Sequence, residues 1–388
     1  MCLAIIARFT YNTNTLKHVI GIALTLIAIA TAMVLLLSAY GGHVDPRSFA
    51  LPSLATLALP VVAFVALLVL VLCIALRSKW PALIVFAAIL LSRPALITVC
   101  PLSHSSELQN PDSTFTVMTW NVIGFEPMTD NTPCSTIKAI LDADADVVLL
   151  QEASLDGYDE FIKHYMVAPV ADEVIKRYPY RSTGPRDVMI LSKVPYTVVP
   201  DTTLVNNLSR DSINEHFHYF GKVFDLNIKG HELRIINLHM QSIGLTSDDK
   251  QLYNDIATLN RKVNTKDELR DVKHSLYDKL SAASSRRAGE ADAVRSIVSA
   301  SGRNVIVCGD FNDTPSSFSY LTIKGDDLRD SFVDCATWPV NTFNDSRLYF
   351  KIDHMLYRGD MRAIKATSPR VGASDHYPLV TTFEWCEE

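Results

Sequence analysis

The chain has 388 residues, of which 48% are hydrophobic and 20% are charged, and its formal net charge is −6 at pH 7. The first hundred residues contain six basic residues and one acid, which leaves 30 basic and 41 acidic residues, a net charge of −11, for the rest. Such an acidic part does not favour tight nonspecific binding to DNA, which relies on Lys and Arg against the phosphates. We therefore expect two unlike parts, a membrane region and a soluble domain long enough to bury a single core.

Three apolar segments precede the soluble domain, at residues 19–40, 51–76 and 80–100. The first two are uncharged and long enough to cross a bilayer. The third is interrupted by Arg93 and Pro94. We interpret it as a third span whose arginine reaches the nearer interface, and the alternative is a segment that only dips into the membrane. Residues 1–100 are thus predicted to form an all-α, multi-pass transmembrane region.

Basic residues beside the spans predict their orientation. Arg8 and Lys17 precede the first span, and Arg77 and Lys79 separate the second from the third. The loop between the first two spans carries only Arg47. Because basic loops stay in the cytoplasm, the N-terminus and the second loop are placed there. Three spans would make the soluble domain extracytoplasmic, whereas a third segment that only dips would make it cytoplasmic.

The seven cysteines contain no C-x-x-C pair and no His/Cys pair at zinc spacing, which argues against a structural zinc. Four of them fall in the soluble domain and could pair in several ways: Cys134, Cys308, Cys335 and Cys386. Cys308 lies within a strongly apolar strand, so we interpret it as an ordinary core residue.

A polar linker at 101–114 leads into the domain at 115–388. Strands are predicted at residues 115–122, 147–151, 188–192, 223–228, 232–240, 350–357 and 376–385, with helical segments at 135–141 and within 241–300. Polar residues close several of these strands. Asn121 lies near the end of the first, Glu152 directly follows the second, and His239 lies near the exit of 232–240. Each alone is also explained as a cap, a solvated strand end or a satisfied structural group.

The stretch Asn304 to Pro315 carries the strongest local signal. Its first half is an uninterrupted apolar run, typical of a strand buried on both faces. Gly309 then permits a tight turn, and Asp310 and Asn312 follow where the strand would open into a cleft. A carboxylate and a carboxamide are hard oxygen donors suited to Mg²⁺ or to orienting a water beside it.

An acid lies inside the predicted strand 350–357. Asp353 is surrounded there by apolar residues and needs a partner if it is buried. The candidate is His376, which follows Asp375 and opens the last strand. An aspartate beside a histidine fixes its tautomer and favours its protonated form. The neighbouring His354 points to the opposite face by alternation and is the weaker candidate.

Together, the segments TWN, QE, NLH, GDFN, ID and SDH, in this order from Thr119 to His376, resemble the endonuclease/exonuclease/phosphatase superfamily, which includes deoxyribonuclease I and exonuclease III. The resemblance covers the chain from Phe115 to the C-terminus. It implies an α/β fold, a four-layer α/β/β/α sandwich of two packed mixed sheets flanked by helices, preceded here by the all-α transmembrane region. It also implies a Mg²⁺ or Mn²⁺ cofactor.

The resemblance implies a role for each matching residue. Glu152 resembles the principal metal ligand, with Asn121 and Asp375 supporting the metal site. Asp310 resembles the residue that orients or deprotonates the attacking water, and Asn312 the one that holds this water or a phosphate oxygen. His376, paired with Asp353, resembles the group that contacts the scissile phosphate, and His239 the second histidine of the deoxyribonuclease-like branch.

We therefore expect a membrane-anchored, divalent-metal-dependent phosphodiester hydrolase, nuclease-like in its chemistry, with no protein partner predicted. Two alternatives remain at this point. The same chemistry could act on a phospholipid or a small phosphoester, or the chain could be a catalytically idle membrane binding protein. A nuclease with this acidic domain would need a local basic patch, for which Arg286 and Arg287 are candidates.

Overall fold

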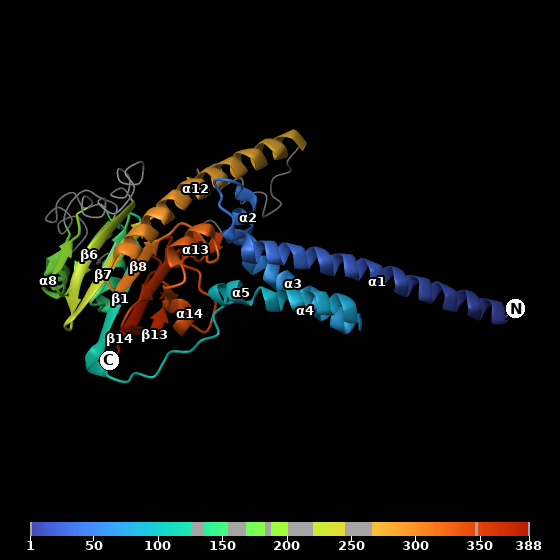
Figure 1. Cartoon of the computed structure of the whole chain (residues 1–388), viewed down its shortest axis with the longest axis horizontal. Coiled ribbons are helices and arrows are strands. Elements are labelled where there is room, and N and C mark those ends of the chain that lie inside the picture. The colour runs from blue at the N-terminus through green and yellow to red at the C-terminus, as the bar shows by residue number, and fades with distance from the viewer. Residues whose placement is uncertain are drawn as a thin grey trace.

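A computed structural model of the chain describes residues 2–125, 135–153, 168–182, 188–200, 220–244, 266–345 and 348–386. Figure 1 shows two parts: a bundle of helices that carries the N-terminus at its far end, and an α/β domain that carries the C-terminus. The first part contains the segments that were predicted to lie in the membrane, and the second contains the residues of the predicted soluble domain.

The N-terminal bundle consists of α1 (Cys2–Tyr40), α2 (Ala50–Ala55), α3 (Leu59–Ala75), α4 (Lys79–Leu91) and α5 (Arg93–Val99), with 3-10 turns η1 (Gly41–His43) and η2 (Thr56–Ala58). Two helical stretches, His18–His43 and Ala50–Ala75, are long and apolar enough to cross a membrane. Small side chains such as Ala28 and Ala66 lie buried at their contacts, which lets apolar helices approach closely.

The third apolar segment is not one straight helix. The helices α4 and α5 are bent by 66° relative to each other, and they meet at Ser92. The break falls where Arg93 and Pro94 interrupt the apolar sequence, because proline cannot donate the hydrogen bond that would continue α4 and its ring crowds the preceding turn.

The first sheet of the domain has the strand order β13-β14-β1-β2-β4-β3. Its strands are β1 (Thr114–Asn121), β2 (Val147–Gln151), β3 (Tyr180–Arg181), β4 (Val188–Ser192), β13 (Met361–Thr367) and β14 (Leu379–Trp385). The central pair, β1 and β2, is parallel, and every other neighbouring pair is antiparallel.

The second sheet has the order β5-β6-β7-β8-β12-β9. Its strands are β5 (Tyr196–Val198), β6 (Gly221–Ile228), β7 (His231–His239), β8 (Val305–Asp310), β9 (Arg329–Asp330) and β12 (Asp353–Arg358). Here too a parallel pair, β7 and β8, lies between antiparallel neighbours. Each sheet therefore has one central pair of strands whose carboxyl ends lie at the same edge. A separate hairpin is formed by β10 (Phe343–Asp345) and β11 (Leu348–Phe350).

The two sheets pack face to face, and helices cover their outer faces. Inward-facing side chains such as Val117 and Ile306 form the core between the sheets. The outer face of the first sheet is covered by α6 (Ser135–Ala143) and α8 (Ala168–Arg177), and that of the second by α12 (Lys266–Ala300) and α13 (Phe318–Lys324). The short elements α14 (Ser331–Cys335) and η3 (Pro111–Ser113) complete the domain. The predicted four-layer α/β/β/α sandwich is confirmed.

The strand that begins the strongest sequence signal is buried on both faces, as predicted. Val305 and Val307 of β8 face the helices, whereas Ile306 and Cys308 face the other sheet. Cys308 is a buried free thiol, as expected for a core residue, and Cys335 and Cys386 are free as well. Cys134 lies outside the described residues.

Two predicted boundaries were wrong. The last strand begins at Leu379, because His376 makes only an isolated bridge to Phe343 before the chain turns into β14. The segment predicted as one strand at 350–357 is the end of β11 followed by β12. The end of the linker is attached to the domain, since the backbone N–H groups of Gln109 and Asn110 donate to the Glu384 carboxylate on β14.

Candidate active site

The polar residues predicted at strand ends meet at one edge of the sandwich. In the first sheet Asn121 is paired in register with Gln151, and Glu152 follows directly. In the second sheet His239 is paired in register with Asp310. Because the strands of each central pair are parallel, their carboxyl ends bring these side chains together.

Asn121 joins the two sheets at this edge. Its amide nitrogen donates to Glu152 Oε1 at 2.9 Å and to Asp310 Oδ2 at 3.0 Å. Its amide oxygen accepts a hydrogen bond from the Ile123 backbone at 3.1 Å. His239 Nε2 lies 3.6 Å from the same Glu152 oxygen and 3.9 Å from Asp310 Oδ2. Two carboxylates from different sheets are therefore held next to each other.

The backbone around these carboxylates is held in unusual conformations. Glu152 and Asn312 have φ values of +51° and +50°, in a region that non-glycine residues rarely adopt. Such conformations persist where the surroundings over-determine them, often at functional sites. Asp310 Oδ1 accepts the Asn312 backbone N–H at 2.8 Å, and the Asn312 side chain donates to the Met240 carbonyl at 2.9 Å. The turn after β8 is thus tied to the turn after β7.

Gly309 is required for this arrangement. Its φ is +130°, and a Cβ at this position would lie 2.0 Å from the carbonyl oxygen of Leu238 on the neighbouring strand. No other residue fits, because the obstacle is backbone and the conformation favours glycine. The close approach of β7 and β8 places His239 and Asp310 side by side at the ends of the two strands.

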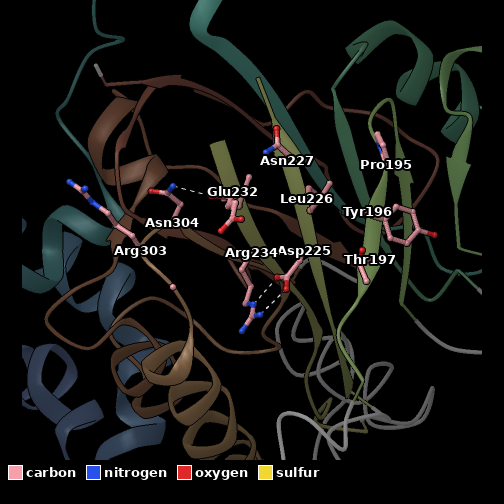
Figure 2. Close-up of a pocket in the computed structure, with 12 residues that line it drawn as sticks. Pro195, Tyr196, Thr197, Asp225, Leu226, Asn227, Glu232, Arg234, Arg303 and Asn304 are labelled. Atoms are coloured by element: carbon pink, nitrogen blue, oxygen red, sulfur yellow. Dashed lines mark hydrogen bonds and ion pairs between the residues drawn. The ribbon is translucent and has the colours of Figure 1, made fainter. Parts of the chain in front are cut away.

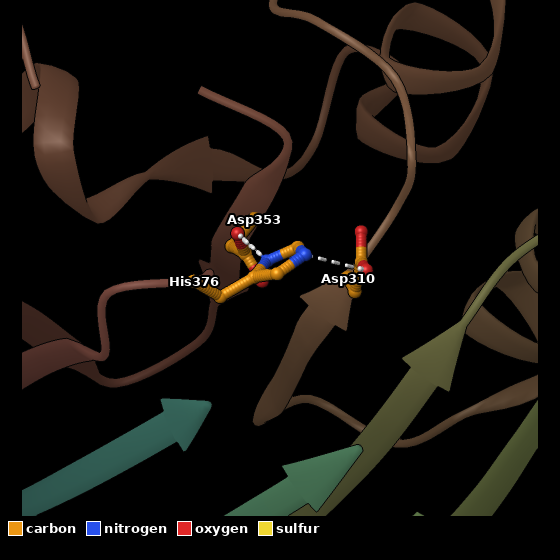
Figure 3. A group of neighbouring side chains, drawn as sticks. All are labelled: Asp310, Asp353 and His376. Atoms are coloured by element: carbon orange, nitrogen blue, oxygen red, sulfur yellow. Dashed lines mark hydrogen bonds and ion pairs between the residues drawn. The ribbon is translucent and has the colours of Figure 1, made fainter. Parts of the chain in front are cut away.

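The predicted pairing of Asp353 with His376 is present. Figure 3 shows the His376 ring between two carboxylates. Its Nδ1 lies 2.9 Å from Asp353 Oδ2, and its Nε2 lies 3.6 Å from Asp310 Oδ2. All three side chains are buried, and their potential ligand atoms lie within 4.8 Å of one another. His354 lies on the other face, where its Nε2 is 2.9 Å from the Asp313 carbonyl.

The two carboxylates favour the charged form of His376. Burial alone would lower the pKa of the imidazole, but the negative charges of Asp353 and Asp310 outweigh it and raise the pKa to about 10. Burial raises the pKa of the Asp353 carboxyl, which His376 opposes. His376 is therefore an imidazolium at neutral pH, with Nε2 directed toward the Asp310 carboxylate.

Residues that the sequence analysis missed hold this pair in place. The Trp120 indole N–H donates to the His376 carbonyl at 2.9 Å, and Ser374 Oγ accepts the His376 backbone N–H at 3.1 Å. Thr342 Oγ1 accepts the backbone N–H of Asp353 at 3.1 Å. The ring of Phe343 packs edge-on against the His376 ring, with centroids 5.0 Å apart. Nothing in their local sequence marks these supporting residues, because all of them reach the pair from distant segments or through the backbone.

Asp375 lies at the margin of the group. Its carboxylate is 3.4 Å from Ser374 Oγ, and its charge contributes to the raised pKa of His376. It is half-buried, whereas Asp310 and Asp353 are buried. Seven of the eight predicted residues are thus connected to one another by hydrogen bonds or close charged contacts: Asn121, Glu152, His239, Asp310, Asn312, Asp353 and His376.

The proposed basic patch is wrong for Arg287. Its side chain is only 2% exposed, and its Nε lies 3.2 Å from Asp313 Oδ2 while its Nη1 donates to the Gln241 carbonyl at 3.0 Å. Glu290, one turn later on α12, accepts the Gln241 backbone N–H at 2.9 Å. Arg287 therefore clamps the turns that follow β7 and β8, and only Arg286 is exposed to solvent.

The residues present fit a hard divalent cation. Glu152, Asp310 and Asp353 supply carboxylates, and the rings of His239 and His376 lie beside them. Oxygen donors of this kind are preferred by Mg²⁺ and Mn²⁺. The side chain of Glu152 is 38% exposed, so the group opens to solvent on that side.

A hollow lies at the opposite end of the second sheet. It has a volume of about 520 Å³ and is lined by β5, by the β6–β7 turn region and by residues 302–304, which precede β8 (Figure 2). Arg234 there is paired with Asp225 at 2.7 Å, and Arg303 is paired with Asp360. Asn304 directly precedes β8 whereas Asp310 ends it. The hollow is therefore separate from the candidate active site.

Comparison with known proteins follows the same division of the chain. The sequence model described as "Endonuclease/Exonuclease/phosphatase family" matches residues 118–376, and one described as "Domain of unknown function (DUF8431)" matches residues 21–99. No curated protein matches the chain.

Several solved structures resemble the chain at low sequence identity. Truncated Caenorhabditis elegans TDP2 is 16% identical, covering 70% of this chain and 97% of its own, with a TM-score of 0.41. An endonuclease/exonuclease/phosphatase family protein from Bacteroides thetaiotaomicron is 15% identical, covering 71% and 98%, with a TM-score of 0.43. ANGEL2, described as a 2',3'-cyclic phosphatase in complex with adenosine-2',3'-vanadate, is 16% identical, covering 70% and 96%, with a TM-score of 0.41.

Proposed function

Because the chain belongs to the Endonuclease/Exonuclease/phosphatase family, whose enzymes hydrolyse phosphoester bonds, we propose that it is a membrane-anchored, divalent-metal-dependent phosphodiester hydrolase. The observation that carries this proposal is the position of the buried His376 ring, with Nδ1 2.9 Å from Asp353 and Nε2 3.6 Å from Asp310. A buried cation next to a buried carboxylate provides both a partner for a phosphate oxygen and a base for a water.

In the proposed reaction, Asp310 orients the attacking water and takes its proton as the oxygen adds to phosphorus. Asp310 is held for this role by Asn121 and by the Asn312 backbone. His376 donates from Nε2 to a non-bridging phosphate oxygen, and Asp353 keeps the proton on Nδ1 and the ring in place. The P–O bond to the leaving alkoxide then breaks, the alkoxide takes up a proton from solvent water, and Asp310 returns its proton to solvent.

Glu152, with support from Asn121 and Asp375, would hold the divalent cation. Bound there, Mg²⁺ or Mn²⁺ would offset the negative charge that develops on the phosphorane-like transition state. His239, 3.6 Å from Glu152, lies beside this position and is assigned to the phosphate as the second histidine.

Nicking of supercoiled plasmid by the full chain in detergent micelles, with Mg²⁺ or Mn²⁺ and with EDTA, tests the nuclease form of this proposal. Asp310→Asn keeps the shape of the side chain but removes the base, and it should lower turnover by orders of magnitude. Asp326→Asn, an exposed aspartate beyond α13, is the matched control and should nick at the wild-type rate. Metal-dependent nicking that persists in Asp310→Asn would refute the role of Asp310.

A lipid phosphodiester is the second candidate substrate. The observation that favours it is the contact between the membrane helices and the segment after Asp310, where Thr98 Oγ1 of α5 lies 3.3 Å from Ser316 Oγ. A substrate held in the same membrane would reach this side of the domain without leaving the lipid surface. Phospholipid in mixed micelles, assayed with the same two variants, distinguishes this candidate from a nuclease.

The contacts of the helix ends support an extracytoplasmic domain. The loop 41–49 between α1 and α2 and the end of α5 both contact the domain, so they lie on its side of the membrane. Arg77 and Lys79 between α3 and α4 then lie on the opposite side, together with the N-terminus. Since basic loops remain in the cytoplasm, the domain lies outside it, and the bent pair α4–α5 completes a third crossing despite its break.

Single-cysteine variants of the full chain test this topology with a membrane-impermeant maleimide on intact cells. The exposed native Cys386 should be labelled from outside, whereas a cysteine at Arg77 should be labelled only after the cells are opened. The reverse pattern would place the domain in the cytoplasm.

A further inference from the structure

The membrane region makes a tight contact with the segment that follows the catalytic strand. Gly42, in the turn after α1, approaches this segment so closely that a Cβ on Gly42 would lie 1.9 Å from the carbonyl oxygen of Ser316 and 2.8 Å from the carbonyl carbon of Ser317. On the other side, Thr98 of α5 contacts the Ser316 hydroxyl. Ser316 is thus held between two ends of the membrane bundle.

Arg47 extends the same interface to the helices of the domain. Its guanidinium is paired with Asp45 in its own loop and with Asp292 on α12, each at 2.7 Å. The same guanidinium lies over the Phe318 ring at the start of α13, 5.9 Å from its centroid. The planar side chain of arginine suits this combination of two carboxylates and a ring. Arg47 therefore joins the α1–α2 loop to two elements that flank the catalytic turn.

The contacted segment leads directly into the candidate active site. Residues 313–317 are buried, and only Asn312 separates them from the pair Asp310–Phe311. Asn312 and Ser316 both have positive φ, at +50° and +72°, so the backbone is strained at both ends of this turn. Arg287 of α12 is paired with Asp313 of this turn. Asp292, also on α12, is paired with Arg47 of the α1–α2 loop, so α12 connects the loop to the turn.

We infer that the α1–α2 loop is a positioning part of the catalytic unit, with Gly42 and Arg47 fixing the turn that carries Asp310 and Asn312. The membrane region is then more than an anchor, because its docking sets the geometry of the reacting groups. The kinetic consequence rests on the proposed phosphodiesterase activity, whereas the docking itself does not.

A single methyl group on Gly42 is the sharpest test. In Gly42→Ala the Cβ contact of 1.9 Å must open by about 1 Å or more, and a displacement of this size at a catalytic group lowers turnover by up to roughly 100-fold. We expect kcat of the full chain to fall about 10-fold to 100-fold with KM unchanged. Gly21→Ala is the matched control, because Gly21 lies in α1 with nothing within 4 Å of its Cβ position.

A cysteine pair measures the docking without reference to activity. Thr98→Cys with Ser316→Cys, in a background with Cys100→Ser and Cys386→Ser, should form a disulfide in the membrane under mild oxidation, and adding Gly42→Ala should reduce its yield. A parent that carries only one of the two new cysteines should not form this disulfide. Arg47→Asp should likewise lower kcat, and Arg47→Asp with Asp292→Arg should recover part of it.

Each outcome decides the inference. A disulfide together with a reduced kcat in Gly42→Ala supports it. Wild-type kcat in Gly42→Ala, or the absence of a disulfide between positions 98 and 316, overturns it. If the chain hydrolyses no phosphodiester but the disulfide forms and depends on Gly42, the docking stands and the proposed function fails.

Discussion

Replacing Asp353 with asparagine should turn the candidate active site into one that works only at low pH. Asparagine keeps the size of the side chain and an oxygen that can accept the His376 Nδ1–H at the observed 2.9 Å. It removes the negative charge that contributes most to the raised pKa of His376. The imidazole ring of His376 should therefore keep its position while its pKa falls.

The structure sets the size of the effect. With a pKa of about 10, nearly all of His376 is protonated at pH 8. If the pKa returns to the ordinary value of about 6.5, about 3% remains protonated at pH 8 and about three quarters at pH 6. The Asp353→Asn variant should therefore be about 30-fold slower than wild type at pH 8 and within about twofold at pH 6. In the variant, burial lowers the pKa of His376 whereas the charges of Asp310 and Asp375 raise it, so the ordinary value sets the order of magnitude of the effect.

The assay is the pH dependence of kcat for a chromogenic phosphodiester, measured with the full chain in detergent with Mg²⁺ or Mn²⁺. Asp330→Asn is the control, since Asp330 is equally buried on the same sheet but is paired with Lys351. It should change the rate by the same factor at every pH. A ratio of Asp353→Asn to wild type that stays constant between pH 6 and pH 8 would refute the reasoning.

The same pair affects stability with a defined sign. The folded pKa of His376 lies above its ordinary value, so the stabilisation is complete below about pH 6.5 and is lost as the pH rises toward 10. Denaturation of wild type and Asp353→Asn across this range should show the difference between them shrinking as the pH rises.

Three further predictions follow from buried groups and from the cation site. Burial and the nearby Lys351 lower the pKa of His354 to about 3, so the folded state favours the neutral ring. The free energy of unfolding should therefore fall as the pH drops below about 6.5, by about 2 kcal/mol at pH 5. His354→Gln should remove this acid dependence in denaturation experiments. Arg287→Ala leaves Asp313 buried without its charge partner and should lower the free energy of unfolding by about 3–5 kcal/mol, whereas Arg286→Ala on the exposed face should change it by less than about 0.5 kcal/mol. EDTA should abolish turnover, and added Mg²⁺ or Mn²⁺ should restore it. Glu152→Gln should need a higher ion concentration than wild type for half-maximal rate. If both proteins need the same ion concentration, Glu152 is not a ligand of the cation.

Many strands of the domain, and the polar residues at their ends, could be predicted from local sequence patterns. The runs at 147–151 and 188–192, which are apolar up to a polar last residue, became β2 and β4 with unchanged bounds, because strands buried on both faces are almost continuously apolar. Polar side chains at the ends of such runs, as Asp310 is at the end of β8, mark the strand ends. The pairing of Asp353 with His376 was also predictable, since a buried acid needs a partner and few candidates remained.

Other features depend on contacts between residues far apart in the chain. The sequence shows Arg286 and Arg287 as adjacent basic residues, and only the packing of α12 against the turns after β7 and β8 buries one and exposes the other. The contact of Gly42 with Ser316 joins segments more than half the chain apart and has no local signal. Local pattern determines which residues enter strands and end them, whereas the meeting of two separate elements depends on the shapes of both surfaces, which only the folded chain brings together.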